Sequence, residues 1–264
     1  MCRYCVVVDD ADAVVAAGYF SSYPAAFGDV ELNPAGNYDA VLWKVNAEGT
    51  TLWAVRGAGT SNEKLNGLAV DRANGANAVV AAGYTISPTA TFGGVVLNNN
   101  AGSYPWDAVV WKMSGEGTTL WAVRGGGTGD PDELYGVAVD AAGAVVAAGA
   151  FRSTAATFGD VTLTLAGTSD TVLWKLNKEG TTLWAVRGGG ANGAATLKDV
   201  TVDGVGDIVA AGYFSATTAT FGGETLNKNS ARNDGSSDAL LWKLSDEGTT
   251  LWVGAYNRPL FSSI

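Results

Sequence analysis

The chain has 264 residues, of which 47% are apolar and only 16% are charged, against a usual charged share of roughly 25%. This composition excludes a disordered chain and a charge-rich coiled coil. The net charge of −10 opposes binding to polyanions, so we expect neither nucleic acid nor an anionic membrane surface as a partner. The absence of histidine removes histidine-based triads, general bases and metal ligands from consideration.

The first residues lack the apolar core and small-residue cleavage site of a signal peptide. No apolar run approaches the ~20 residues that span a bilayer, so we expect no membrane insertion. A cytosolic protein and a mature or truncated piece of an exported protein both fit these observations, and we assign no compartment.

Cys2 and Cys5 form a C-x-x-C motif, which is compatible with a redox pair or with half of a zinc site. The chain has no other cysteine and no histidine to complete a zinc site. The motif also continues into a strand-like run over 5–8 rather than a helix. Two incidental thiols are therefore the favoured interpretation.

One unit recurs four times along the chain. A segment of the type Val-Val-Ala-Ala-Gly has its glycine at Gly18, Gly83, Gly149 and Gly212, at intervals of 65, 66 and 63 residues. Two tryptophan motifs recur with it, at Trp43, Trp111, Trp174 and Trp242 and at Trp53, Trp121, Trp184 and Trp252. We predict a single domain over 1–264, with repeats at about 5–66, 67–135, 136–198 and 199–256 and a tail at 257–264.

Each repeat predicts short strands and almost no helix, because no sustained 3.6-residue apolar period is present. In the third repeat the expected strands are 136–140, 145–149, a short segment ending at 163, 170–176 and 182–186. The last two are joined by Asn177-Lys178-Glu179-Gly180, and every repeat has Asn or Ser first and Gly fourth at this place. This pattern predicts a type I turn with a glycine bulge between antiparallel strands.

The strands beside this turn are apolar on both faces. Val41 and Trp43 lie on one face of their strand and Leu42 lies on the other, so both faces must be covered. A series of small antiparallel sheets, each packed face to face on its neighbours, is typical of a β-propeller. We expect an all-β, closed four-bladed ring, with an open partial propeller as the alternative.

At this point the residues resemble a known family, the β-propeller repeats of surface and secreted bacterial proteins (SBBP-type repeats), and loosely the NHL blades. The matching segments in the third repeat are 136–140, 145–149, Thr157-Phe158-Gly159 and Leu183-Trp184-Ala185. The resemblance covers the whole chain four times. It implies a propeller and an extracellular or cell-surface setting, and it implies no activity. The chain departs from the family pattern by a second tryptophan in each repeat, such as Trp174.

The aromatic residues have two interpretations. The repeated tryptophans are suited to stacking on sugar rings or other flat ligands, but we favour docking between neighbouring blades, because a buried ring stabilises more than an exposed one. Trp106 lies outside the repeat pattern, shortly after Tyr104 in a loop. Trp106 and Tyr104 are therefore our candidates for contact with a ligand.

The repeated and clustered carboxylates also have two interpretations. Asp39, Asp107, Asp170 and Asp238 suit either a cation-binding ring around an axis or caps of the turns before their strands, and we favour caps. The same holds for Asp9, Asp71, Asp140 and Asp203. The acidic loop with Asp130, Asp132 and Glu133 has hard oxygen ligands suited to Ca²⁺, although it does not match an EF-hand loop.

Folding explains every repeated feature, and variation is confined to the connecting loops. We therefore expect a non-catalytic interaction or scaffold module that binds a protein or glycan partner through loops on one face. No catalytic residue and no cofactor other than the Ca²⁺ candidate is assigned. The alternatives are a propeller enzyme and a carbohydrate- or Ca²⁺-binding module. The oligomeric state is left open.

Overall fold

The computed structural model describes residues 5–73, 77–99, 106–128, 130–228 and 236–256. In these ranges the named elements are 24 β-strands, and they pair in an antiparallel manner within five sheets. The all-β, antiparallel class expected from the sequence is confirmed. No helix in the described ranges has the length and apolar character needed to cross a membrane.

Four of the sheets are built on one repeat each, and three of these have six strands. In order across the sheet, sheet 1 contains β1 (Cys5–Val8), β2 (Val14–Phe20), β5 (Asp39–Val45), β6 (Thr51–Gly59), β9 (Thr89–Phe92) and β10 (Val95–Asn98). Sheet 2 contains β7 (Glu63–Asp71), β8 (Ala78–Thr85), β11 (Asp107–Met113), β12 (Thr119–Gly127), β15 (Ala155–Phe158) and β16 (Val161–Thr164). Sheet 3 contains β13 (Glu133–Val139), β14 (Val145–Phe151), β17 (Asp170–Leu176), β18 (Thr182–Gly189), β21 (Thr218–Phe221) and β22 (Glu224–Asn227). Sheet 4 contains β19 (Ala195–Val202), β20 (Ile208–Phe214), β23 (Asp238–Leu244) and β24 (Thr250–Tyr256), and β3 (Ala25–Phe27) pairs with β4 (Val30–Leu32) alone.

The last two strands of each six-stranded sheet come from the following repeat. The hairpin β15–β16 lies between β14 and β17 in the chain, yet it pairs with β12 of sheet 2, where Gly125 faces Phe158. The sequence predicted one short segment at this place. The structure resolves that segment into two strands, and they extend the sheet of the neighbouring repeat.

A glycine near the end of the outer strand makes room for the hairpin of the following repeat. A Cβ atom at Gly125 would lie 2.3 Å from Cδ1 of Phe158, so the phenylalanine ring occupies the place of the missing side chain. The ring also meets Trp174 of its own repeat edge to face, with 5.4 Å between the ring centroids. The equivalent pairs are Gly57 with Phe92 and Gly188 with Phe221.

The turn between the third and fourth strand of each repeat has the predicted chemistry. In the first repeat the Gly49 N–H donates to the Asn46 carbonyl at 3.0 Å, and the Thr50 N–H donates to Asn46 Oδ1 at 2.8 Å. Gly49 has a φ of +83°, a left-handed conformation that glycine adopts at no steric cost. The hairpin prediction is confirmed.

The sheets pack face to face through both of their apolar faces. We call front the face of each sheet that carries Val15 or its equivalent, and back the opposite face. Between sheets 1 and 2, Val15 and Leu42 of one front face pack with Val79 and Trp111 of the next back face, and all four are fully buried. Equivalent clusters lie between sheets 2 and 3 and between sheets 3 and 4.

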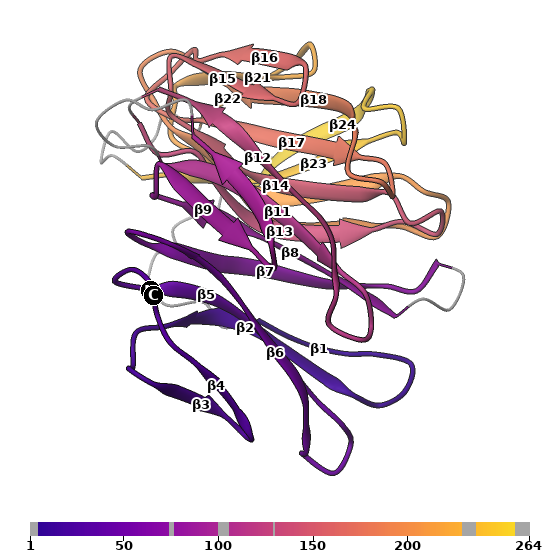
Figure 1. The fold of residues 1–264 in the computed structure, drawn as a ribbon. Helices are drawn as coiled ribbons and strands as arrows, with labels where there is room; N and C mark the ends of the chain where they lie inside the picture. The colour runs from indigo at the N-terminus through magenta and orange to yellow at the C-terminus, as the bar shows by residue number, and fades with distance from the viewer. Residues whose placement is uncertain (1–4, 74–76, 100–105, 129, 229–235, 257–264) are drawn as a thin grey trace, which may run out of the picture.

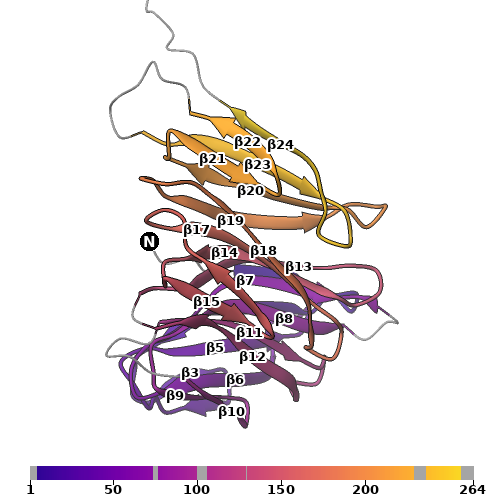
Figure 2. The same ribbon diagram turned by 90° about the horizontal axis from the view of Figure 1, so that it is seen from above.

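The four sheets form an open series. The innermost strands lie side by side from β7 to β13 and from β13 to β19, and β7 also packs on β1 and β2. Among the described residues, no packing of comparable extent joins β1 with β19. In Figure 1 β1, β2 and β5 lie below β7 and β8, and in Figure 2 β23 and β24 lie at the end of the molecule beyond β19 and β20. The closed four-bladed ring favoured from the sequence is therefore not confirmed.

The glycine positions allow a matched test of the strand exchange. In Gly188→Ala the new Cβ would lie 1.9 Å from Cδ1 of Phe221, whereas at Gly254 in β24 a Cβ meets nothing within 4 Å. We expect Gly188→Ala to lower the free energy of unfolding by about 1–3 kcal/mol through overpacking. Gly254→Ala should change it by less than about 0.5 kcal/mol. Urea unfolding of both variants checks this, and equal losses would contradict the proposed role of the glycine.

Candidate functional site

A lysine forms an ion pair at the end of each sheet that carries the β5–β6 type hairpin, and it is buried in sheets 1 to 3 and half-buried in sheet 4. Lys44 pairs with Asp9 at 2.7 Å, and the lysine side chain is only 6% exposed. Its ammonium also donates to the Gly115 carbonyl of the next repeat at 3.0 Å. The equivalent pairs are Lys112 with Asp71 at 2.7 Å, Lys175 with Asp140 at 3.1 Å and Lys243 with Asp203 at 2.8 Å.

The aspartates of these pairs also shape the first turn of each repeat. Oδ1 of Asp140 accepts the backbone N–H groups of Ala142 and Ala144, both at 2.9 Å. Asp9 and Asp203 make the same two contacts. The capping interpretation is confirmed for these aspartates, because their oxygens are used by the turn and by the lysine.

The repeated tryptophans connect neighbouring sheets. Trp53 on the front face of sheet 1 donates its indole N–H to the Gly115 carbonyl at 3.0 Å. Trp121 donates in the same way to the Lys178 carbonyl and Trp184 to the Asp246 carbonyl. The second set, represented by the fully buried Trp111, donates to the threonine opposite, Thr119, at 3.0 Å. Docking between sheets, the favoured interpretation, is confirmed for the tryptophans at the three internal interfaces: Trp53, Trp121, Trp184, Trp111, Trp174 and Trp242. Trp43 and Trp252 lie on the two outer faces, of sheet 1 and sheet 4.

Arginine–aspartate pairs hold the opposite, loop end of the sheets. Asp39 is fully buried and accepts the backbone N–H groups of Ala35 and Gly36 at 2.8 and 3.1 Å. It also pairs with Arg56 at 3.2 Å. Asp107 pairs with Arg124, and Asp170 pairs with Arg187, while Asp238 is buried at the start of β23. Asp39 thus acts as a cap within its own repeat, as the sequence analysis favoured.

The acidic loop proposed for Ca²⁺ does not converge on one point. Asp132 is fully buried and accepts N–H groups of Gly127, Arg152 and Ser153 and the Ser153 hydroxyl. Asp130 is exposed, and Glu133 is half-buried on β13. In the described ranges no three histidine, cysteine or acidic side chains are grouped as metal ligands. Ca²⁺ binding at these residues stays a prediction.

Trp106 lies beside the start of β11 and packs on Tyr84, with 5.0 Å between the ring centroids. It is half-buried, and its carbonyl accepts the Asp132 N–H at 2.8 Å. Tyr104, its partner in the sequence prediction, lies outside the described residues, as does Cys2. Cys5 is on β1, where its thiol donates to the Asn66 carbonyl at 2.9 Å.

Asp107 at the loop end has a raised pKa. Burial raises its pKa to about 6, and the nearby Asp132 carboxylate adds to this effect while Arg124 opposes it. Burial also raises the pKa of Asp132, Glu63 and Asp170. At the hairpin end, burial of Asp9 is outweighed by its hydrogen bonds to Lys44 and the turn, so its pKa is lowered.

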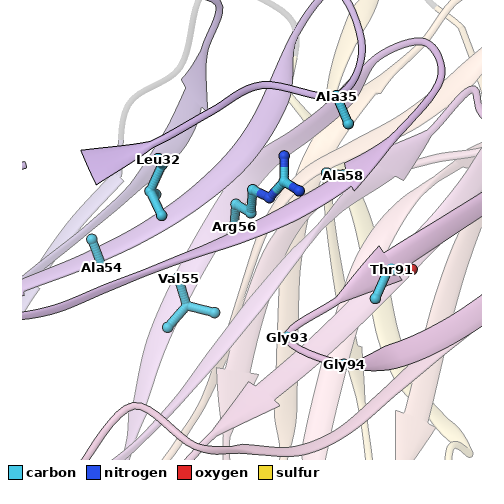
Figure 3. A pocket seen from close by; sticks show the side chains of 9 residues that line it. All are labelled: Leu32, Ala35, Ala54, Val55, Arg56, Ala58, Thr91, Gly93 and Gly94. Carbon is cyan, nitrogen blue, oxygen red and sulfur yellow. The ribbon is translucent and has the colours of Figure 1, made fainter. Parts of the chain in front are cut away.

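A groove lies along the outer strand β6 at the loop end (Figure 3). It has a volume of about 440 Å³, and the Arg56 side chain, 40% exposed, crosses it toward the buried Asp39. The other lining residues are small or apolar and come from β4, β6, β9 and the adjoining loops: Leu32, Ala35, Ala54, Val55, Ala58, Thr91, Gly93 and Gly94. Its one cation, Arg56, is already paired with Asp39.

A larger unused surface is the front face of sheet 4. Leu241 on β23 is 48% exposed, whereas its equivalent in sheet 3, Leu173, is fully buried. Trp252 on β24 is 45% exposed, against 9% for Trp53. Tyr213 on β20 adds a third exposed apolar side chain. This face has the composition of the buried front faces but has no sheet upon it among the described residues.

The sequence analysis missed this face, although a signal for it was present. Three repeats end their outer strand with Arg and Gly, as at Arg56 and Gly57, and the fourth has Ala255 and Tyr256 instead. Tyr256 occupies the position where the other strands receive a phenylalanine ring. The variable connecting loops favoured for partner binding, around Pro131 and over 227–237, lie at the loop end, and residues 129 and 229–235 of them lie outside the described residues.

No family model matches this chain, and no curated protein matches it at a significant level.

The raised pKa of Asp107 predicts a pH-dependent stability. Its ordinary value is 3.8 and its value in the folded protein is about 6, so the folded state binds the proton more tightly. The stabilisation is full below pH about 4 and is lost as the pH rises through about 6. We expect the free energy of unfolding to fall over this window by on the order of 2–3 kcal/mol. In Asp107→Asn this fall should shrink, as measured by urea unfolding at several pH values.

An unchanged slope in Asp107→Asn would contradict this assignment. Asp9 titrates with the opposite sign, because its pKa is lowered in the folded protein. Its contribution is therefore present above its ordinary range and is lost only as the pH falls further. The contributions of Asp107 and Asp9 to the free energy of unfolding are therefore lost in different pH ranges.

Proposed function

We propose that the four repeats are blades of an open, partial β-propeller and that the chain acts as a non-catalytic interaction module. In this proposal the front face of sheet 4 binds a protein partner. The side-by-side packing of β7, β13 and β19 supports the blade arrangement, since the innermost strands of blades lie around a common axis.

The exposure of large apolar side chains on one sheet face carries the proposal. Leu241 and Trp252 are 48% and 45% exposed, and Tyr213 and Tyr256 extend the same patch. Contiguous apolar patches of this kind, when not covered, mark protein interaction sites or aggregation-prone surfaces. Aromatic side chains in particular are enriched where proteins bind one another.

The polar side chains of the repeats support a non-catalytic role. The lysine–aspartate and arginine–aspartate pairs and the indole N–H groups of Trp53, Trp121 and Trp184 all hold the sheets or turns together. These groups are used by the fold, whereas the sheet 4 face is not. Binding through that face requires no chemistry beyond apolar contact and a few hydrogen bonds at its edge.

Acrylamide quenching of tryptophan emission tests whether this face is open. The emission of Trp252 is obtained as the difference between the wild type and Trp252→Phe in dilute solution. We expect strong quenching, because the side chain is 45% exposed. The emission of Trp174, obtained in the same way from the wild type and Trp174→Phe, should be quenched hardly at all, because this side chain is 1% exposed. Protection of Trp252 in a dilute, monomeric sample would contradict the proposed docking face.

A further inference from the structure

We propose that the front face of sheet 4 binds the back face of sheet 1 in a second copy of this chain, so that copies associate head to tail. This inference rests on the proposed function, since it names the partner of the docking face. It extends to two molecules an interface that occurs three times within one molecule.

The front face supplies an indole donor to each internal interface. Trp53 donates to the Gly115 carbonyl, and its ring lies against Gly117, where a Cβ would be 2.7 Å from the indole. Trp121 and Trp184 make the same contacts with the next two hairpins. Trp252 is the fourth member of this series, and its indole N–H has no acceptor among the described residues.

The matching acceptor, at the other end of the series, has no donor among the described residues. The hairpin of sheet 1 places the Ala47 carbonyl where the second repeat has that of Gly115, and Gly49 where it has Gly117. At Gly49 a Cβ atom would meet nothing within 4 Å. A tryptophan ring packs against the equivalent glycine of the other three hairpins, whereas the space beside Gly49 is open.

Two strand edges, one at each end of the series, lack a partner strand among the described residues. One belongs to the hairpin β3–β4 and the other to the outer strand β24. The hairpin β3–β4 pairs with no other described strand, whereas β9–β10, β15–β16 and β21–β22 each extend a preceding sheet. The outer strand β24 has β23 as its one neighbour in the described part of sheet 4. A second copy brings to each face the type of element that covers its equivalents.

One residue limits the strength of this contact. Tyr256 occupies the position of Gly57, Gly125 and Gly188, on which a phenylalanine ring lies. The Tyr256 side chain, which is 72% exposed, lies where the Phe27 ring of a second copy would pack. Phe27 can pack there only if the tyrosine side chain moves. The contact between copies therefore relies on Trp252 and Leu241 more than on strand pairing, and we expect it to be weaker than an internal interface.

A second copy fits better than an unrelated partner because one chain carries both halves of the interface. Sheets 1 and 4 do not pack on one another within the molecule to any comparable extent, so the halves meet only between molecules. Each copy carries a net charge of −10, and the resulting repulsion is screened by salt. Association should therefore strengthen as the salt concentration rises.

Two variants, each blocking one half, test the head-to-tail arrangement. Leu241→Asp puts a charge on the front face of sheet 4, at an exposed position. Ala16→Arg puts a long cation on the back face of sheet 1, where Ala16 is half-buried and its equivalent in sheet 2, Ala81, is fully buried. Circular dichroism and thermal melting verify that each variant folds. Sedimentation equilibrium then gives the mass of the wild type, of each variant and of their mixture over a range of concentrations.

We expect the wild-type mass to rise with concentration beyond that of a dimer and each variant alone to stay monomeric. The mixture should form one-to-one dimers, because only one competent pair of faces remains. Tyr256→Gly should strengthen wild-type association by about tenfold, equivalent to roughly 1.4 kcal/mol. Trp252→Ala should weaken it.

A monomeric wild type at all concentrations and salt conditions would overturn the second-copy inference. If Trp252 is still quenched in that monomer, the docking face stands and has another partner; if Trp252 is protected, both proposals fail. Dimers of Ala16→Arg alone would also overturn the head-to-tail arrangement, because they would require two sheet 4 faces to pair with each other.

Discussion

Coverage of both faces of every sheet is the constraint on which this structure depends. Val15 on the front face of sheet 1 and Trp111 on the back face of sheet 2 are fully buried only because the two sheets pack together. The three large apolar clusters each draw residues from two repeats, and among the described residues only the small cluster of Phe20, Ala25 and Val41 lies within one repeat. Stability is therefore a sum over interfaces, as in other repeat architectures.

The exchanged hairpins make this dependence directional. Sheets 1, 2 and 3 each receive two β-strands from the repeat that follows, so sheet 2 is completed by β15–β16 and sheet 3 by β21–β22. The glycine of the outer strand and the phenylalanine of the hairpin form one unit across the boundary, as Gly125 and Phe158 do. Lysine and tryptophan contacts at the hairpin end cross the same boundary. Neighbouring repeats are thereby tied together at both ends of the interface.

Local chemistry explains which parts of this fold the sequence could predict. The turn at Asn46–Gly49 was predictable because the side-chain hydrogen bond and the positive φ reside in four residues. The caps made by Asp9 and Asp39 follow from the same short-range logic. The partner of β15–β16 was not predictable, because the pattern of a four-residue strand carries no information about which edge it joins. Ring closure was equally inaccessible, since it depends on the angle between packed sheets.

The front face of sheet 4 is a repeated interface without a partner sheet among the described residues. Capping faces of repeat arrays are usually polar, whereas this face keeps Leu241 and Trp252 at the positions used for burial elsewhere. Tyr256 departs from the pattern because it replaces the glycine on which a phenylalanine ring packs in the other sheets, but it leaves the rest of the apolar surface in place. Because an uncovered face of this composition favours association and a net charge of −10 opposes it, the balance between the two sets the state of the chain in solution. Ionic strength acts on the charge repulsion, so it is the variable that shifts this balance most directly.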